Sequence, residues 1–458
     1  MDRIRLLQSR KKQILDAGKD IRKDINSLVD DKSFVELSVF SFSESEFYGE
    51  NAEGEGVITG FATIDGFPFY IVAQNFAVLS GGISKANCEK IVKCLNQAEK
   101  ADAPVIYLLS SLGVRVGEGV NALEGLAALI LKASQLKGSV SQYLIVNGEI
   151  YGQAAVLAGI CDFTFFIDKK SVLAVNSPMV ISAKSGVNKT KTDVGGADAL
   201  QQANLCSFKA KNIAEIKDII VKINNLTSTA VTDCDNLNDV LPELDKKTDS
   251  KTLLGIFDKG TLLEIGGSFS PEIKCILGRV GGISVAAAVF DGQDGVELSA
   301  LNIRKLKDFA EFACCCGLPY INFVNARGIK ADLNTNNSIV LKEIGEYVSV
   351  LDCIDSPKIS VICGKAVGIG YTLFAAKSMG YDYSYAFATA KAALFDGAQG
   401  AEIEFTDVKD VDKEKLALRY SEDNSDPINA AKCGYIDNIV QPSLIKQYLI
   451  ASLQMLLK

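Results

Sequence analysis

Nearly continuous apolar runs alternate along the chain with segments whose apolar residues recur at helical spacing. Residues 105–109 (VIYLL) and 359–363 (ISVIC) are almost entirely apolar, which is typical of strands buried on both faces of a parallel sheet. In residues 85–100 and 301–316 apolar side chains return every three to four positions, which predicts amphipathic helices. The pattern therefore predicts an α/β fold with mostly parallel sheets.

The same order of predicted elements occurs twice along the sequence. Residues 140–166 and 357–387 each read as strand, glycine, turn, helix, aspartate and strand. Asp162 and Asp382 match between the copies, and we interpret them as structural residues at strand ends. Three pairs of glycines lie 215 or 216 residues apart (328 − 113, 364 − 148 and 368 − 152): Gly113 and Gly328, Gly148 and Gly364, and Gly152 and Gly368. This repetition favours two homologous lobes.

A more polar segment separates the two copies. Residues 184–249 are richer in Lys, Asn, Thr and Asp, with one helical pattern at 212–226. We interpret this segment as a connector with surface character. The boundary is placed after residue 242, so that the lobes span residues 1–242 and 243–458.

Charge and apolar run length restrict the class of protein. The net charge of −8 and the pI near 5.0 argue against broad nucleic-acid binding. No apolar run approaches the roughly 18 residues of a membrane span, and the charged start MDRIRLLQSRKKQ lacks the apolar core of a secretory signal. We therefore expect a cytoplasmic protein with no nucleic-acid partner and no membrane insertion.

Two residue types restrict the chemistry. The 12 cysteines form no Cys-x-x-Cys pair, so we expect neither a metal site nor disulfides and interpret Cys314–Cys316 as small buried hydrophobes. The chain has no histidine. This excludes Ser-His-Asp and Cys-His catalysis, and with it a ClpP-like serine protease on a related spiral fold.

One predicted turn between a strand and a helix is rich in glycine. Gly368-Ile369-Gly370 follows the second apolar strand, and the first turn of a helix carries unpaired N–H donors that can face an oxygen. No Gly-Lys-Ser/Thr follows, and Leu373 stands where a dinucleotide fingerprint has its third glycine. The turn therefore fits neither a phosphate loop nor a dinucleotide-binding motif, and its free amides are expected to bind the oxygen of another kind of ligand.

Four stretches resemble, in order, the carboxyltransferase subunit of biotin-dependent acyl-CoA carboxylases. They are residues 49–84 (GENAEGEGVITGFATIDGFPFYIVAQNFAVLSGGIS), 110–119 (SSLGVRVGEG), 364–403 (from GKAVGIGYTLF to GAQGAEI) and 426–442 (DPINAAKCGYIDNIVQP). The resemblance covers nearly the whole chain and implies two crotonase/ClpP-like spiral lobes. The chain is similar in the same places to the carboxyltransferase subunits of biotin-dependent acyl-CoA decarboxylases.

The resemblance implies a chemistry that needs no histidine. A carboxyl group moves between carboxybiotin and a coenzyme A thioester, and the cofactor supplies the base. No Met-Lys-Met attachment signal occurs in the chain, so the biotin belongs to a separate carrier. The resemblance assigns the amides of Ile369 and Gly370 to the biotin ureido oxygen, and those of Gly152 and Gln153 to the thioester oxygen. These two oxyanion holes are the predicted catalytic groups.

Further site residues follow from family position. The predicted substrate-binding residues are Gly113, Val114, Arg115, Tyr151 and Thr372, and the predicted biotin-side residues are Gly328 and Gly368. Lys90 and Lys93 are interpreted as solvated. Three motifs depart from the family: Ala-Gly-Gly becomes Tyr151-Gly152-Gln153, Ser-Gly-Gly-Ala-Arg becomes Ser111-Leu112-Gly113-Val114-Arg115, and Asp-Val-Pro-Gly becomes Asn325-Ala326-Arg327-Gly328.

The sequence favours the carboxyltransferase component of a biotin-dependent acyl-CoA carboxylase. Its expected partners are a biotin carboxyl carrier protein, a biotin carboxylase subunit and further copies of itself, as a dimer or hexamer. Two alternatives stay open. One is the same subunit in a decarboxylase, and the other is a non-catalytic scaffold that keeps the fold.

Overall fold

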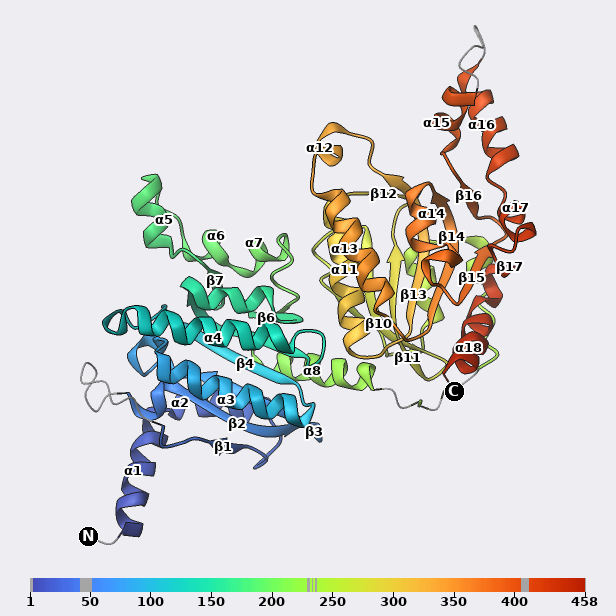
Figure 1. The fold of residues 1–458 in the computed structure, drawn as a ribbon. Helices are drawn as coiled ribbons and strands as arrows, with labels where there is room; N and C mark the ends of the chain where they lie inside the picture. The colour runs from blue at the N-terminus through green and yellow to red at the C-terminus, as the bar shows by residue number, and fades with distance from the viewer. Residues whose placement is uncertain are drawn as a thin grey trace. The chain divides into compact units, whose positions relative to one another are not determined.

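The computed structural model describes residues 3–41, 52–228, 231–232, 234, 237–404 and 412–457. The chain forms two compact units, Met1–Asn224 and Asn225–Lys458, each built around one sheet (Figure 1). Thr232 and Leu241, near the start of the second unit, pack against the rest of it, since the Thr232 amide donates to Gly282 and the Leu241 amide donates to Ser443.

The sheet of the first unit is antiparallel at one edge and parallel elsewhere. Its order is β1-β2-β3-β4-β5-β6-β8, with β7 paired to β5. The β1–β2 and β2–β3 pairs are antiparallel, and all later pairs are parallel. The strands are β1 (Val35–Leu37), β2 (Val57–Ile64), β3 (Phe67–Gln74), β4 (Val105–Ser111), β5 (Gln142–Tyr151), β6 (Phe163–Ile167), β7 (Val172–Ala174) and β8 (Phe208–Ala210).

Helices cover this sheet, with α3 against β2 and β3 and α4 against α3 (Figure 1). The α-helices are α1 (Arg3–Ala17), α2 (Lys19–Leu28), α3 (Lys85–Ala101), α4 (Val120–Leu136), α5 (Pro178–Ser185), α6 (Lys191–Gly195), α7 (Ala197–Gln201) and α8 (Ile213–Thr227). The 3₁₀ helices are η1 (Glu53–Gly56), η2 (Leu79–Gly81), η3 (Val116–Glu118) and η4 (Gly152–Gly159).

The second unit repeats the same layout. Its sheet runs β17-β15-β14-β13-β11-β10-β9, with β12 paired to β13 and β16 to β14. The strands are β9 (Leu263–Ile265), β10 (Ile273–Val280), β11 (Ile283–Phe290), β12 (Val296–Leu298), β13 (Tyr320–Ile329), β14 (Lys358–Val367), β15 (Tyr383–Phe387), β16 (Lys391–Ala393) and β17 (Asn438–Val440).

In this unit α11 packs against β10, β11 and α13 (Figure 1). The α-helices are α9 (Glu243–Lys246), α10 (Ser250–Leu253), α11 (Ala300–Cys315), α12 (Leu333–Asn336), α13 (Val340–Asp352), α14 (Ile369–Phe374), α15 (Gly397–Glu404), α16 (Lys413–Asn424), α17 (Pro427–Lys432) and α18 (Ile445–Leu456). The 3₁₀ helices are η5 (Leu254–Ile256), η6 (Lys377–Met379) and η7 (Pro442–Leu444).

The register of the central strands confirms the repeat. The pairing of β4 with β5 shifts after Leu109, and the pairing of β13 with β14 shifts after Val324, 215 residues later (324 − 109). Asp162 accepts a hydrogen bond from the Gln142 amide at 2.7 Å, and Asp382 accepts one from the Lys358 amide at 2.8 Å. The two aspartates therefore hold strand ends, as the sequence predicts.

The polar segment between the repeats is not a surface connector throughout. Phe208 lies in β8, which extends the first sheet beside β6. The predicted helix is present as α8, and Ile216, Ile220 and Ile223 of this helix are fully buried. The prediction was wrong here because short strands such as β8 leave little periodic signal in a polar stretch. Cys314–Cys316 are half-buried rather than core residues.

We expect alanine at Gly364 to destabilise the second unit. A Cβ on Gly364 would lie 2.4 Å from Asn325 Oδ1, which already accepts from the Lys365 amide at 2.9 Å. Overpacking of this kind costs about 1–3 kcal/mol. Denaturant titration should show this loss for Gly364→Ala, whereas Gly159→Ala, which has open space around its Cβ, should be near neutral. Equal stability of both variants would contradict the predicted overlap.

Candidate functional site

The first glycine turn lies where β5 ends and η4 begins. Gly152 has φ +78°, and Gly113, just beyond β4, has φ +122°, both in the region that favours glycine. The Gly113 Cα lies only 3.9 Å from the place where a Cβ on Gly152 would stand. Two strand ends therefore meet at this turn, and the positive φ rather than lack of space favours glycine at position 152.

The second glycine turn repeats this arrangement between β14 and α14. Gly368 has φ +53° and Gly328 has φ +98°. A Cβ on Gly328 would lie 3.4 Å from the Val367 carbonyl oxygen, and one on Gly370 would lie 2.9 Å from the Ala326 Cβ. The backbone of α14 thus begins directly against the end of β13, as η4 begins against the end of β4.

Hydrogen bonds correct one predicted donor. The Gly152 amide donates to the Val175 carbonyl at 3.1 Å, and the equivalent Gly368 amide donates to Ala393 at 3.0 Å. Both amides are used where the chain pairs with the short strands β7 and β16. Gly152 is therefore a conformational residue and not an oxyanion donor. The repeat makes Gln153 and Ala154 the equivalents of Ile369 and Gly370 (369 − 153 and 370 − 154).

The next amides remain available. Within the described ranges, the amides of Gln153, Ile369 and Gly370 have no backbone or side-chain acceptor. Gln153 is exposed and Ile369 half-buried, so solvent reaches both turns. Free N–H groups at the start of a short helix can form a donor pair for an anionic oxygen, and the role of Ile369 and Gly370 toward biotin stays a prediction.

Arg115 does not lie at the surface. Its side chain is 2 % exposed and pairs with Glu55, which is fully buried, at 3.1 Å. The guanidinium also donates to the carbonyl groups of Gly82 and Glu55. Direct contact of this guanidinium with CoA finds no support in this geometry, because its donors face the protein interior.

The other predicted substrate residues lie beside the turns. Val114 is half-buried and pairs with Ile83 in a parallel bridge. Tyr151 is buried, and burial raises the pKa of its phenol. Thr372 is exposed on α14, and its hydroxyl donates to the Gly368 carbonyl at 3.2 Å. Contact of these residues with a substrate stays a prediction.

A buried polar motif that the sequence did not lead us to expect occurs in both units. Lys90 is buried, contrary to its interpretation as solvated, and Nζ donates to the carbonyl groups of Gly54 and Val57 at 2.9 and 2.7 Å. Burial lowers its pKa to about 8. Lys305, 215 residues later (305 − 90), is also buried and donates to Phe269. Lys93 is exposed, as predicted.

The signal for this motif was present in the sequence. The same spacing of a serine, an asparagine and a lysine occurs in both copies: Ser84, Asn87 and Lys90, and Ser299, Asn302 and Lys305. Each serine caps its helix, and each asparagine is buried. Residues three apart lie on one helix face, so a polar repeat on the core side of both helices indicates a buried network.

An ion-pair cluster lies beside the second turn. Arg327 binds Asp396 through Nε and Nη2, each at 2.8 Å, and Lys365 pairs with Asp294 at 2.8 Å. Burial opposes ionisation of Asp396, yet the Gly397 amide, Lys365 and Arg327 together hold its pKa below the ordinary value. Arg327, which departs from the family motif, thus ties α15 to the end of β13.

The lowered pKa of Asp396 predicts a pH-dependent contribution to stability. A carboxyl whose pKa falls on folding stabilises the protein above its ordinary pKa, and this contribution is lost as the pH falls through the lowered value. We expect Asp396→Asn to lower the unfolding temperature near neutral pH, with little difference from the parent in acid well below an ordinary aspartate pKa of about 3.9. A pH-independent difference in calorimetry would contradict this role.

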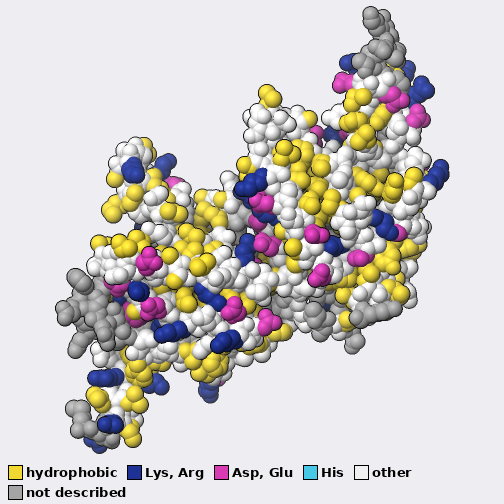
Figure 2. All heavy atoms as spheres, in the orientation of Figure 1, with side chains coloured by type: hydrophobic (Ala, Val, Ile, Leu, Met, Phe, Trp, Pro, Cys, Tyr) yellow, Lys and Arg dark blue, Asp and Glu magenta, His cyan; other side chains and the backbone are white. Residues whose placement is uncertain are grey.

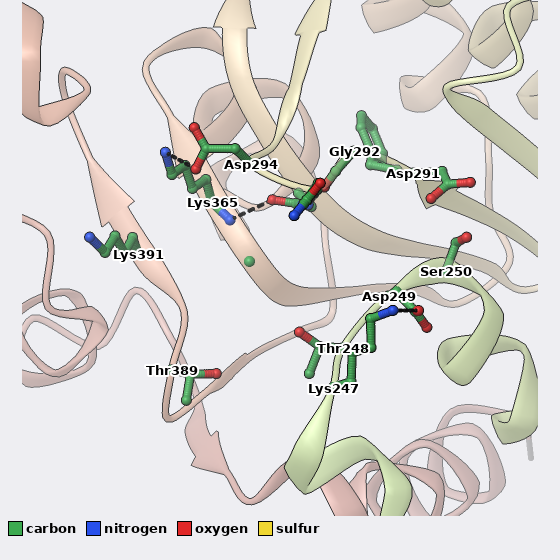
Figure 3. A pocket seen from close by; sticks show the side chains of 14 residues that line it. Lys247, Thr248, Asp249, Ser250, Asp291, Gly292, Asp294, Lys365, Thr389 and Lys391 are labelled. Atoms are coloured by element: carbon green, nitrogen blue, oxygen red, sulfur yellow. Dashed lines mark hydrogen bonds and ion pairs between the residues drawn. The ribbon is translucent and has the colours of Figure 1, made fainter.

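A cavity of about 510 Å³ lies in the second unit beside this cluster. Figure 3 shows Lys365 directed toward Asp294 at its edge, with Lys247 paired to Asp249 across the cavity. Each of these lysines already has a carboxylate partner. In the part of the chain that the structure describes, no cluster of three or more metal-ligating side chains occurs, and no helix is long and apolar enough to cross a bilayer.

Comparison with known proteins identifies the family. The carboxyl transferase domain matches residues 15–458. This chain belongs to the carboxyl transferase domain family. It is 29% identical to the methylmalonyl-CoA decarboxylase subunit alpha of Veillonella parvula, over 95% of this chain and 89% of that protein. It is 28% identical to the propionyl-CoA carboxylase carboxyltransferase subunit of Haloferax mediterranei, over 96% and 91%.

A solved structure gives the same fold for this carboxyl transferase domain. The hexameric transcarboxylase 12S, with methylmalonyl-CoA and methylmalonic acid bound, matches with a TM-score of 0.92 and 23% identity, over 99% of this chain and 96% of that one. The predicted α/β fold with two lobes is therefore confirmed, and so is the predicted family.

Proposed function

We propose that this carboxyltransferase moves a carboxyl group between biotin on a separate carrier protein and an acyl-CoA thioester. The observation that carries the proposal is the pair of matched glycine turns, each of which presents unpaired backbone amides. Two enolate-like oxygens must be stabilised in such a transfer, one on the cofactor and one on the thioester. A duplicated lobe supplies one donor set for each.

The first turn suits the thioester oxygen. The Gln153 amide is unpaired within the described residues and, with Ala154, occupies the same register as Ile369 and Gly370. Preorganised amides aimed at a developing negative charge lower the barrier to enolate formation. The bulkier Tyr151 and Gln153 do not remove a donor from this turn, because any residue except proline offers an amide. This favours a catalytic subunit over the scaffold alternative.

The second turn suits the ureido oxygen of biotin. Its donors, Ile369 and Gly370, begin α14, where Ile369 is half-buried and Gly370 is buried, so a cofactor that arrives on a carrier can approach the turn from the side of Ile369. When bound, biotin carries the carboxyl group and supplies the base that this histidine-free chain lacks. The chain itself binds and orients the oxygen. The same amides serve carboxylation and decarboxylation, so the partner complex sets the direction.

We also propose that each site is completed by a second copy of the chain. Hydrophobic side chains are exposed over α5 of the first unit and over the loop that carries α12 of the second (Figure 2). Met179 and Leu341 are 79% and 78% exposed, and exposed apolar groups of this kind mark protein interfaces. Val175, whose carbonyl accepts from Gly152, is exposed as well.

Light scattering should therefore give a dimer or a larger assembly. Met179→Asp and Leu341→Asp should each shift the protein toward monomer, because a carboxylate buried in an interface is costly. A parent protein that is monomeric at micromolar concentration would contradict this arrangement. Substitution of an exposed residue on α3, such as Lys93→Asp, serves as the control and should leave the assembly unchanged.

A transfer assay tests the proposed activity. The purified chain is incubated with methylmalonyl-CoA labelled in the carboxyl group and with free biotin, and the label lost from the thioester is followed with and without biotin. We expect biotin-dependent transfer, together with a chain that carries no biotin of its own on streptavidin blotting. Absence of transfer, combined with no binding of acyl-CoA or biotin in calorimetry, would support the scaffold alternative instead.

A further inference from the structure

Two energetic costs coincide at Glu55 in η1. Its side chain is 0% exposed, and its backbone has φ +61°, a left-handed conformation that is unfavourable for a residue other than glycine. Within the described residues, Oε1 of this carboxylate has no hydrogen-bond partner. A buried charge is weak support for stability, and backbone strain gathers at functional sites. These costs indicate that Glu55 serves something other than stability.

The other carboxylate oxygen joins two loops. Glu55 Oε2 accepts from Ser84 Oγ at 2.8 Å and from Arg115 Nη1 at 3.1 Å. Arg115 Nη2 donates to the Glu55 carbonyl, and Nε donates to the Gly82 carbonyl, both at 3.1 Å. All three guanidinium nitrogens of Arg115 therefore donate hydrogen bonds, and because the group is planar these bonds fix a single orientation.

Backbone hydrogen bonds connect Arg115 to the first glycine turn. Its backbone amide donates to the Ile83 carbonyl at 2.8 Å, and the Ile83 amide donates to the Gly113 carbonyl at 3.0 Å. Gly113 in turn lies against Gly152, with 3.9 Å between its Cα and a Cβ placed on Gly152. A continuous chain of contacts thus links the buried carboxylate to the backbone just before Gln153.

The second unit lacks this pair. The Asn75 amide donates to Gly56 and the Asp291 amide donates to Glu272, which match 216 residues apart, so Pro271 stands at the position of Glu55 (271 − 55 = 216). Lys330 stands at the position of Arg115 (330 − 115 = 215), is exposed and pairs with Asp332 at 3.0 Å. The buried ion pair is therefore particular to the first unit, where the thioester is proposed to bind.

We infer that Glu55 is a positioning residue for the first turn: through Arg115 it holds Gly113 against Gly152 and so sets the geometry of the amides that face the thioester oxygen. This inference rests on the proposed function. It predicts that loss of the carboxylate impairs turnover of the acyl-CoA thioester, while the biotin side, which belongs to the other unit's turn, is unaffected.

The test compares Glu55→Gln, Glu55→Asp and a matched control. Glu36→Gln removes the carboxylate of the half-buried Arg22–Glu36 pair of the same unit, away from the glycine turns. In the transfer assay we expect Glu55→Gln to lower kcat on the order of 10- to 100-fold, with the KM for biotin unchanged and partial recovery in Glu55→Asp. Hydrogen exchange in residues 112–119 should become faster in Glu55→Gln and stay as in the parent for Glu36→Gln.

Two results would overturn the inference. One is a Glu55→Gln protein whose activity falls only in proportion to its folded fraction, as for Glu36→Gln, because that is a purely structural effect. The other is unchanged hydrogen exchange in residues 112–119. If the unmutated chain transfers nothing, the proposed function fails by itself, and the exchange measurement still decides whether Glu55 holds this loop.

Discussion

Ile369→Pro should abolish most carboxyl transfer while Ile369→Ala should retain it. Proline removes the amide at the first position of α14, where its fixed φ is compatible with a helix, and this amide has no acceptor within the described chain. Loss of one oxyanion donor costs about 10²–10³ in rate. Alanine keeps the amide and changes only the side chain, so the two variants separate the backbone role from packing.

Position 369 is a sharper probe than position 370. A Cβ on Gly370 would lie 2.9 Å from the Ala326 Cβ, so any substitution there also disturbs the contact of α14 with β13. Thermal unfolding and acyl-CoA binding, which we propose for the first unit, serve as controls for Ile369→Pro. A folded Ile369→Pro protein that binds acyl-CoA and transfers at nearly the parent rate would refute the assignment.

Arg115→Met should strongly destabilise the first unit. Methionine leaves the fully buried Glu55 without its cation, and breaking a buried pair in this way costs about 3–5 kcal/mol. That is a large part of the total stability of an ordinary domain, about 5–15 kcal/mol. Denaturant unfolding of the first unit measures the effect directly.

The control for Arg115→Met is an exposed ion pair of the same unit. Lys209 binds Asp168 and Asp198 at 3.0 and 2.8 Å, with its side chain 31% exposed. Lys209→Met should cost no more than about 1 kcal/mol. Similar losses of unfolding free energy in both variants would mean that the buried Glu55–Arg115 pair matters no more for stability than an exposed ion pair. This result would also weaken the case for Glu55 as a positioning residue.

The repeat could be predicted from the sequence because it depends on backbone geometry. Gly113, Gly152, Gly328 and Gly368 all have positive φ, a conformation that few other residues adopt, so their spacing reports the turns directly. The apolar strands and helices around them follow from hydrophobic periodicity. These two signals were enough for the fold class and the duplication, whereas the role of Ile369 and Gly370 was inferred from the family resemblance.

The donors of the first turn could not be assigned from sequence alone. Whether the Gly152 amide is free depends on β7, a strand of three residues, which is too short for a periodic signal. Arg115 was predicted to bind substrate and Lys90 to be solvated, and burial was expected for neither because charged residues are rarely buried. Their burial depends on partners distant in the chain, Glu55 for Arg115 and the Gly54 and Val57 carbonyl groups for Lys90.

The central claim is that the two matched turns serve two different ligands, and amide hydrogen exchange measures this most directly. We expect an acyl-CoA to slow exchange at residues 152–155 and biotin to slow exchange at residues 368–371, each without effect on the other turn. Protection of both turns by the same ligand, or of neither turn by either ligand in a protein that transfers carboxyl groups, would contradict the account.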